Sequence, residues 1–85
     1  DKAALRPDLL VCDFRLPDNQ TALDVMREMR DYWSELPVLI VTGDTGSEAL
    51  QAIKQSGASL LHKPIAPTRL RSMMFLVMQG AGKSQ

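Results

Sequence analysis

Three polar residues of different chemical types each follow a short apolar segment of this sequence. Asp13 ends the segment LLVCD, Thr42 ends VLIVT, and Lys63 comes directly after ASLLH. Together, these residue types suit phosphoryl transfer to a carboxylate, with Asp13 as the nucleophile. Lys63 would hold a phosphoryl oxygen, and the Thr42 hydroxyl and nearby backbone N–H groups would hydrogen-bond the others. A divalent cation, usually Mg²⁺ on oxygen ligands, would neutralise the charge.

Each of the three residues also has an ordinary structural explanation. An Asp after a strand is commonly a turn or cap residue, and Thr-Gly is common turn chemistry. A Lys before Pro is commonly a solvated residue in an extended segment. Because three different reactive types follow three apolar segments, the structural and the chemical explanations stay equally open at this point.

Short apolar runs predict the strands that would carry these residues. Residues 9–13 and 38–42 are short apolar runs, which are typical of strands covered on both faces of a sheet. Residues 58–62 are predicted to form a third short strand. The segment between the first strand and Ala22 has no periodicity and contains Pro, Asp and Asn, which indicates a loop.

Apolar residues at three- and four-residue steps predict a helix after each strand. The expected helices span residues 22 to about 33, 47–56 and 68–79. Thr45 and Glu48 have the spacing of a capping box, Gly57 suits a helix end, and Pro67 suits a helix start. The last helix contains MMFLVM and is apolar on nearly every side, so we expect both core and partner contacts there.

The alternation of strands and helices predicts an α/β fold with a doubly wound parallel sheet. Residues 1–6 could end a preceding helix before Pro7, which would close it. In such sheets, ligands bind beyond the carboxyl ends of the strands. We therefore expect Asp13, Thr42 and Lys63 to lie side by side at one edge.

Length and composition exclude several classes of function. The 85 residues form at most one small domain, expected over residues 1–80 with a tail at 81–85. Ten basic and ten acidic residues cancel, so the charge favours neither nucleic acid nor anionic lipid as a partner. No apolar stretch is long enough to cross a membrane. The single cysteine, Cys12, has no internal disulfide partner and fits a cytoplasmic location.

The motifs DFRLP, VTGD and HKP, in this order, resemble the receiver domain of two-component signalling. The segments CDFRLPDNQTALDVM and GASLLHKPIAP are most similar to the C-terminal receiver module of a hybrid sensor histidine kinase. The resemblance covers residue 5 to about residue 78. It implies a flavodoxin-like sheet of order 2-1-3-4-5, of which this chain supplies only strands 3, 4 and 5 with flanking helices.

The resemblance also implies a role for each site residue. Asp13 would be the phosphoacceptor, Thr42 the switch hydroxyl with Gly43 beside it, and Lys63 the invariant lysine. The Lys63–Pro64 peptide bond would be cis. The expected phosphodonor is a histidine kinase or a histidine phosphotransfer protein, and slow self-dephosphorylation would follow.

The sequence departs from the family pattern at several points. Leu60 stands where an aromatic side chain commonly responds to the threonine, and Ala22 where glycine is common. The family's first strand, with the acid pair that binds metal, its first helix and its second strand have no counterpart here, and we expect them upstream. For Mg²⁺, this chain offers the Asp13 carboxylate and the backbone carbonyl of Arg15.

Two other functions stay open. Phosphohydrolases of the haloacid dehalogenase type also use a strand-end Asp, but they need a second Asp two residues later, where this chain has Arg15. A truncated or degenerate receiver could only dock or form a homodimer, through the apolar last helix or the open edge of the first strand. His62 and Trp33 are interpreted as non-catalytic residues.

Overall fold

The computed structural model describes residues 7–43 and 46–79 as alternating strands and helices. The elements are β1 Leu10–Asp13, α1 Ala22–Arg30, β2 Val38–Thr42, α2 Ser47–Ser56, β3 Ser59–His62 and α3 Pro67–Met78. This order confirms the predicted alternation. The predicted helix end before Pro7 and the predicted tail at 81–85 lie outside the described residues.

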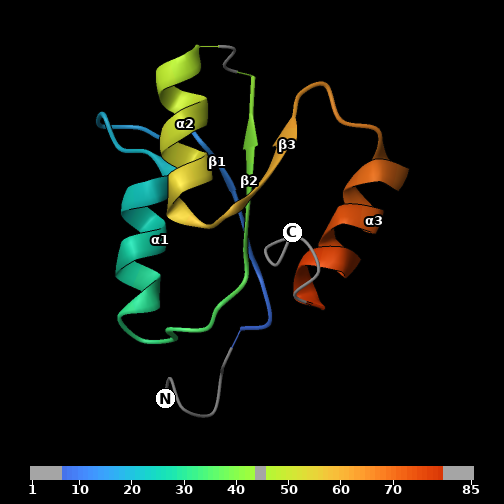
Figure 1. Cartoon of the computed structure of the whole chain (residues 1–85), viewed down its shortest axis with the longest axis horizontal. Coiled ribbons are helices and arrows are strands. Elements are labelled where there is room, and N and C mark those ends of the chain that lie inside the picture. The colour runs from blue at the N-terminus through green and yellow to red at the C-terminus, as the bar shows by residue number, and fades with distance from the viewer. Residues whose placement is uncertain (1–6, 44–45, 80–85) are drawn as a thin grey trace.

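The three strands form one parallel sheet with the order β1-β2-β3. Helices α1 and α2 lie on one face of the sheet, and α3 lies on the other face (Figure 1). The α/β class with helices on both faces is therefore confirmed. Because crossover helices return antiparallel to the strands, the three strands end at the same edge of the sheet.

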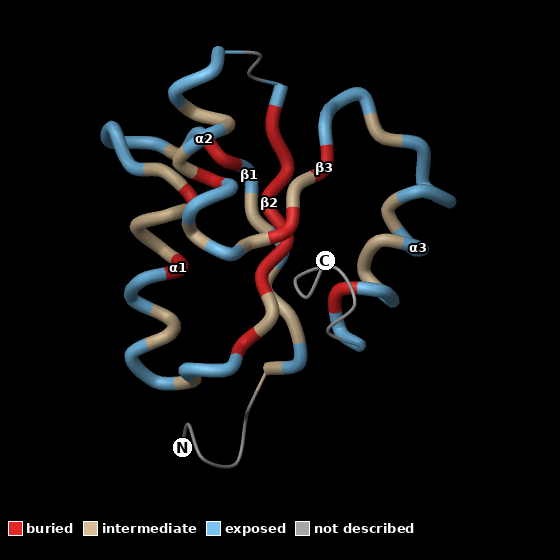
Figure 2. Tube along the Cα trace, in the orientation of Figure 1, coloured by how far each residue is buried: buried red, intermediate tan, exposed pale blue. Residues whose placement is uncertain are grey.

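Each face of the sheet has its own apolar core. Under α1 and α2, the buried side chains are Phe14, Ala22, Met26, Val38, Ile40 and Ile53. Under α3, they are Leu39, Leu61 and Val77. Successive residues of β2 point to opposite faces, so this strand serves both cores and is buried along its whole length (Figure 2).

The first strand is less buried than its apolar sequence predicts. Leu10 and Cys12 pack against the core under α1 and α2, so Val11 points to the opposite face, where it is 41% exposed. Helix α3 packs mainly over β2 and β3. The prediction that residues 9–13 and 38–42 form strands covered on both faces therefore holds for β2 and is wrong for β1, because β1 lies at the edge of the described sheet.

Helix α1 begins with a capping box that the sequence analysis did not identify. The Thr21 hydroxyl accepts a hydrogen bond from the Leu23 N–H, and the Asp24 carboxylate accepts one from the Thr21 N–H. The helix ends at Arg30, earlier than predicted. The Arg30 guanidinium donates to the carbonyl of Leu36, so it ties the helix end to the segment that leads into β2.

The ends of the other two helices follow their sequence signals in part. Gly57 ends α2 with a φ of 85°, and Pro67 stands in the first turn of α3, as predicted. The predicted capping box of Thr45 and Glu48 rests on Thr45, which lies outside the described residues. The N-cap residue of α2 is Gly46, which has no side chain to form such a cap.

Candidate functional site

Asp13 stands where β1 leaves the sheet. It lies opposite Val41 of β2, and the N–H of the next residue, Phe14, donates to the Val41 carbonyl over 2.8 Å. The Asp13 side chain is 53% exposed. The backbone therefore fixes the position of the carboxylate, while solvent and a phosphodonor can still reach it.

The ammonium group of Lys63 reaches Asp13 across the end of β2. The Lys63 N–H donates to the Thr42 carbonyl over 2.9 Å, which fixes its backbone directly after β3. Its Nζ lies 2.7 Å from Oδ1 of Asp13, and the Lys63–Pro64 peptide bond is cis. Both side chains are about half exposed, and such ion pairs contribute only about 0–1 kcal/mol to stability. The pair is therefore better suited to binding an anion than to stabilising the fold.

Thr42 lies at the end of the middle strand, between the strand ends that carry Asp13 and Lys63. It is only 2% exposed, whereas the following Gly43 is exposed. The structure therefore places a carboxylate-bearing, a hydroxyl-bearing and an ammonium-bearing residue at one edge of the sheet.

Comparison with known proteins shows the family to which the chain belongs. A family model described as the response regulator receiver domain matches residues 2–75. The chain belongs to this family. Receiver domains act in two-component signal transduction, with histidine kinase or phosphotransfer domains as partners.

Two curated relatives agree with this assignment. The chain is 30% identical over 78 residues to "Regulatory protein LuxO" of Vibrio cholerae serotype O1, a match that covers 91% of this chain and 17% of that protein. It is 32% identical over 89 residues to "Response regulator MprA" of Mycolicibacterium vanbaalenii, which covers 96% of this chain and 38% of that protein. The chain thus spans well under half the length of either relative.

Phe14 anchors the receiver domain's loop directly after Asp13. It is buried, its N–H donates to Val41, and its carbonyl accepts a hydrogen bond from the Ala22 N–H over 2.8 Å. The loop is therefore attached to β2 on one side and to the start of α1 on the other. The sequence pattern predicts only a loop at Phe14, although a large aromatic residue directly after an apolar strand is a signal of burial.

The remainder of that loop is a tight hairpin. Arg15 and Thr21 form an antiparallel bridge, and the Leu16 N–H donates to the Gln20 carbonyl over 3.0 Å. The two residues at the tip, Asp18 and Asn19, both have a φ of 61°. Positive φ at both central positions is the pattern of a type I′ turn, which Asp and Asn adopt more readily than most residues.

The described residues supply few oxygen ligands for a cation. Across residues 7–43 and 46–79, no group of three or more His, Cys, Asp or Glu side chains is placed to hold a metal ion. The candidate ligands are the Asp13 carboxylate, which is paired with Lys63, and the Arg15 backbone carbonyl. Mg²⁺ requires an octahedral set of oxygen ligands, so these two donors do not make a site by themselves.

The thiol of Cys12 lies beside the candidate site. It donates to the backbone carbonyl of Asp13 over 3.3 Å. The pKa of the Cys12 thiol is raised above its ordinary value, mainly by partial burial and to a smaller extent by the negative charge of Asp13. The thiol is therefore protonated and a weak nucleophile at neutral pH.

Leu60 and His62 belong to β3, and Trp33 lies beyond the C-terminal end of α1. Leu60 is half-buried and packs against the core under α1 and α2. His62 is exposed. Trp33 lies just beyond the end of α1 with its ring 5.7 Å from that of Tyr32, so its contacts are packing contacts.

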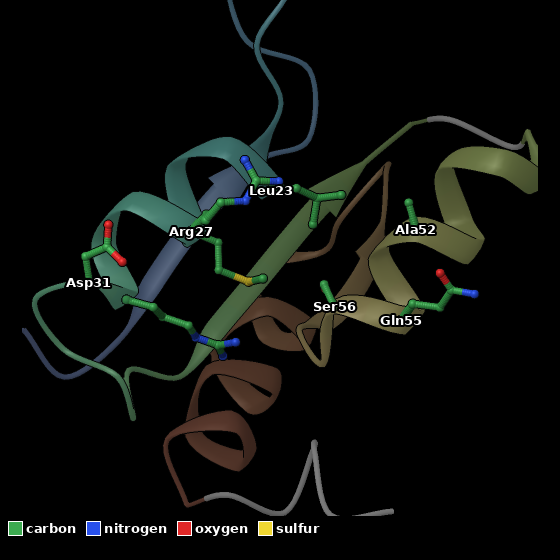
Figure 3. Close-up of a pocket in the computed structure, with 8 residues that line it drawn as sticks. Leu23, Arg27, Asp31, Ala52, Gln55 and Ser56 are labelled. Carbon is green, nitrogen blue, oxygen red and sulfur yellow. The ribbon is translucent and has the colours of Figure 1, made fainter.

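A hollow of about 530 Å³ separates α1 from α2, away from the three strand ends (Figure 3). Leu23, Arg27 and Asp31 line it from α1, and Ala52, Gln55 and Ser56 line it from α2. None of the predicted site residues lines this hollow.

No helix among the described residues has the length and apolar character needed to span a bilayer.

Proposed function

We propose that this receiver domain accepts a phosphoryl group from phosphohistidine onto Asp13. The observation that supports this most strongly is the 2.7 Å contact between the exposed Asp13 carboxylate and the Lys63 ammonium group at the ligand-binding edge of the sheet. A nucleophilic carboxylate with a cation in contact can receive an anionic group, because the cation offsets the added charge.

The proposed reaction is a transfer from nitrogen to oxygen. A carboxylate oxygen of Asp13 attacks the phosphorus, the P–N bond breaks, and the imidazole leaves with the bonding electron pair. Lys63 then pairs with an oxygen of the phosphoryl group, while the Thr42 hydroxyl and the N–H of Gly43 donate to the others. Attack of water on the phosphorus returns the carboxylate and releases phosphate slowly.

The proposed cofactor and cellular setting follow from this reaction. Mg²⁺ would supply positive charge at the aspartyl phosphate, with the Asp13 carboxylate and the Arg15 carbonyl among its oxygen ligands. The donor would be a histidine kinase or a histidine phosphotransfer protein in the cytoplasm. The similarity of the segments CDFRLPDNQTALDVM and GASLLHKPIAP to hybrid histidine kinase receiver modules supports a position within such a kinase.

Modification by a small phosphodonor tests the proposal. The chain is incubated with phosphoramidate and MgCl₂, and its intact mass is followed over time. We expect one added phosphoryl group, and we expect Asp13→Asn to abolish it. Asp18→Asn is the matched control, because Asp18 is an exposed aspartate in the nearby turn and Asn tolerates its positive φ.

A second form of the protein separates the possible outcomes. A version extended upstream by the strand-helix-strand segment that the family resemblance implies should be modified faster than the 85-residue chain. Failure of both forms to take up phosphate would contradict the phosphoacceptor role. Release of phosphate over many turnovers would instead favour a hydrolase.

Docking without phosphorylation is the second candidate function. Apolar side chains on the outer side of α3 support it, with Phe75 59% and Met78 46% exposed. In this function Asp13 would carry no phosphoryl group, so the phosphoramidate experiment distinguishes the two candidates. A homodimer through α3 or through the edge of β1 stays a prediction of this second candidate.

A further inference from the structure

The hollow between α1 and α2 has the size and lining of a small-molecule site. Its volume is about 530 Å³, within the range of about 300–1,000 Å³ that ligand pockets occupy. Leu23, Met26 and Ala52 give it an apolar lining, and Met26 is buried. Figure 3 shows Leu23 projecting from α1 towards α2, with Ala52 and Ser56 on the facing side of α2. The hollow therefore offers apolar contacts from two helices to one bound molecule.

Two arginines of α1 give the hollow a positive charge. Arg27 and Arg30 are three residues apart, so they share one side of the helix, and both line the hollow. Asp31 is the acidic residue of the lining, and the lining residues from α2 are uncharged. Two positive charges therefore stand against one negative charge, and this balance favours an anionic ligand.

The charge of both arginines is available to a ligand. Nη1 of Arg27 lies 3.4 Å from Oδ1 of Asp24, and the two side chains are 74% and 45% exposed, so this ion pair is weak. Arg30 donates to the carbonyl of Leu36 over 3.2 and 3.4 Å. Because a carbonyl is uncharged, this contact does not neutralise the guanidinium. A carboxylate can therefore form a charge-assisted hydrogen bond here without displacing a strong ion pair.

We propose that the α1–α2 hollow binds a small carboxylate whose apolar body has the size of one or two rings. The apolar body would lie against Leu23, Met26 and Ala52, and the carboxylate would pair with Arg27 or Arg30. The planar guanidinium group matches the geometry of a carboxylate. This site lies away from the three strand ends, so the inference does not depend on phosphorylation of Asp13.

The upstream segment that the family resemblance implies would not cover this hollow. Helix α1 packs mainly over β1 and α2 mainly over β3, so the hollow between them lies above the middle of the described sheet. An added strand would pair with β1 along the edge that faces away from β2. A helix attached to that strand on this face would lie beyond α1, on the side opposite α2.

A partner helix fits the hollow less well than a compact ligand does. A helix with its side chains is about 10–12 Å across and rises about 5.4 Å per turn, so one turn fills about 500 Å³. The hollow would therefore hold only a single turn. Helices that bind in grooves use anchor residues over about two turns.

Binding of 2-naphthoate tests the proposal. The acid is titrated into the 85-residue chain, and binding is followed by two-dimensional amide NMR. We expect shifts mainly in residues of α1 and α2, with a dissociation constant of about 0.1–1 mM for a fragment of this size. The alcohol 2-naphthalenemethanol has the same rings without the charge and should bind about fivefold more weakly. Equal affinities of the two compounds, or no shifts in α1 and α2, would overturn the proposal.

Two pairs of variants locate the site. Ala52→Leu should fill the hollow and abolish binding, whereas Gln51→Leu, at an exposed position outside the hollow, should leave binding unchanged. Arg27→Gln should weaken binding about fivefold, whereas Lys54→Gln removes a positive charge outside the lining and should have little effect. Equal effects within either pair would overturn the proposal. Amide spectra without ligand show whether each variant is folded, and the Arg27 and Lys54 pair decides if Ala52→Leu unfolds.

Two further measurements test other occupants of the hollow. A homodimer in sedimentation that Ala52→Leu dissociates would assign the hollow to a second copy and overturn the proposal. Loss of 2-naphthoate binding in the version extended upstream would mean that the domain's own segment covers the hollow, which would also overturn it. A monomeric extended form that binds 2-naphthoate with unchanged affinity would support the proposal.

Discussion

Nζ of Lys63 lies 2.7 Å from Oδ1 of Asp13, although the strands that precede these residues are not neighbours in the sheet. β2 lies between β1 and β3, and neighbouring strands in a sheet are about 4.8 Å apart. The backbones of β1 and β3 are therefore separated by about 10 Å. A long, flexible side chain is required to cross that distance. The pair therefore depends on the pairing of β1 with β2 and of β2 with β3.

Removing the charge of Lys63 should affect the reaction far more than the fold. We expect Lys63→Met to slow modification by phosphoramidate about tenfold or more, because a preorganised cation is lost. The free energy of unfolding should change by less than about 1 kcal/mol, because the ion pair is half exposed. Lys54→Met, on the exposed side of α2, is the control for both measurements. Equal rates in the two variants would argue against a role for Lys63.

Two substitutions of Thr42 should separate its hydroxyl from its packing. Thr42→Val keeps the side-chain volume and removes the hydroxyl, so we expect slower modification of Asp13. Thr42→Ser keeps the hydroxyl but removes a buried methyl group, so we expect a near-normal rate and a loss of about 1 kcal/mol in the free energy of unfolding. Rates from mass spectrometry and midpoints from urea unfolding check both. Similar rates for the two variants would contradict a role for the hydroxyl.

The thiol of Cys12 should report the charge of Asp13. Burial and the Asp13 carboxylate both raise the pKa of Cys12, so Asp13→Asn should lower that pKa part of the way towards its ordinary value. The pH dependence of alkylation by iodoacetamide measures the pKa. An unchanged profile in Asp13→Asn would mean that burial alone causes the shift.

The same shift predicts a loss of stability at alkaline pH. A raised pKa in the folded state means that the unfolded chain loses the thiol proton first as the pH rises. The contribution of Cys12 to stability is therefore complete below the ordinary thiol pKa and declines as the pH rises through the folded-state value. Urea unfolding between neutral and alkaline pH should show a smaller decline in Cys12→Ser. An identical decline would assign the effect to other groups.

Gly57 should be required for its backbone conformation rather than for space. Its φ is 85°, and a Cβ added there would meet no atom within 4 Å. We expect Gly57→Ala to cost about 1 kcal/mol in the free energy of unfolding, because an L side chain is strained in the left-handed region. Gly57→Asn should recover part of this loss, since Asn tolerates that region better. Equal stabilities of the Ala and Asn variants would contradict this explanation.

Local signals in the sequence were enough to predict the order of elements and most of their ends. The apolar run before Asp13, the stop at Gly57 and the start at Pro67 each act over a few residues, so a linear pattern can reveal them. Signals that depend on folding back were missed. The Arg30 guanidinium bonds to the Leu36 carbonyl only after the chain has turned back beyond α1, and the anchoring of Phe14 rests on β2 and α1.

The sequence by itself determined which residue types stand at the strand ends, because short apolar runs and parallel crossovers place Asp13, Thr42 and Lys63 at one edge of any such sheet. Only the tertiary structure decided that Asp13 and Lys63 touch, because that contact depends on strand order and on a side chain that crosses β2. The tertiary structure also decided burial: Val11 is partly exposed although its neighbours are apolar, since α3 packs mainly over β2 and β3. Apolar patterning records a preference for burial, whereas the arrangement of the helices determines which side chains are covered.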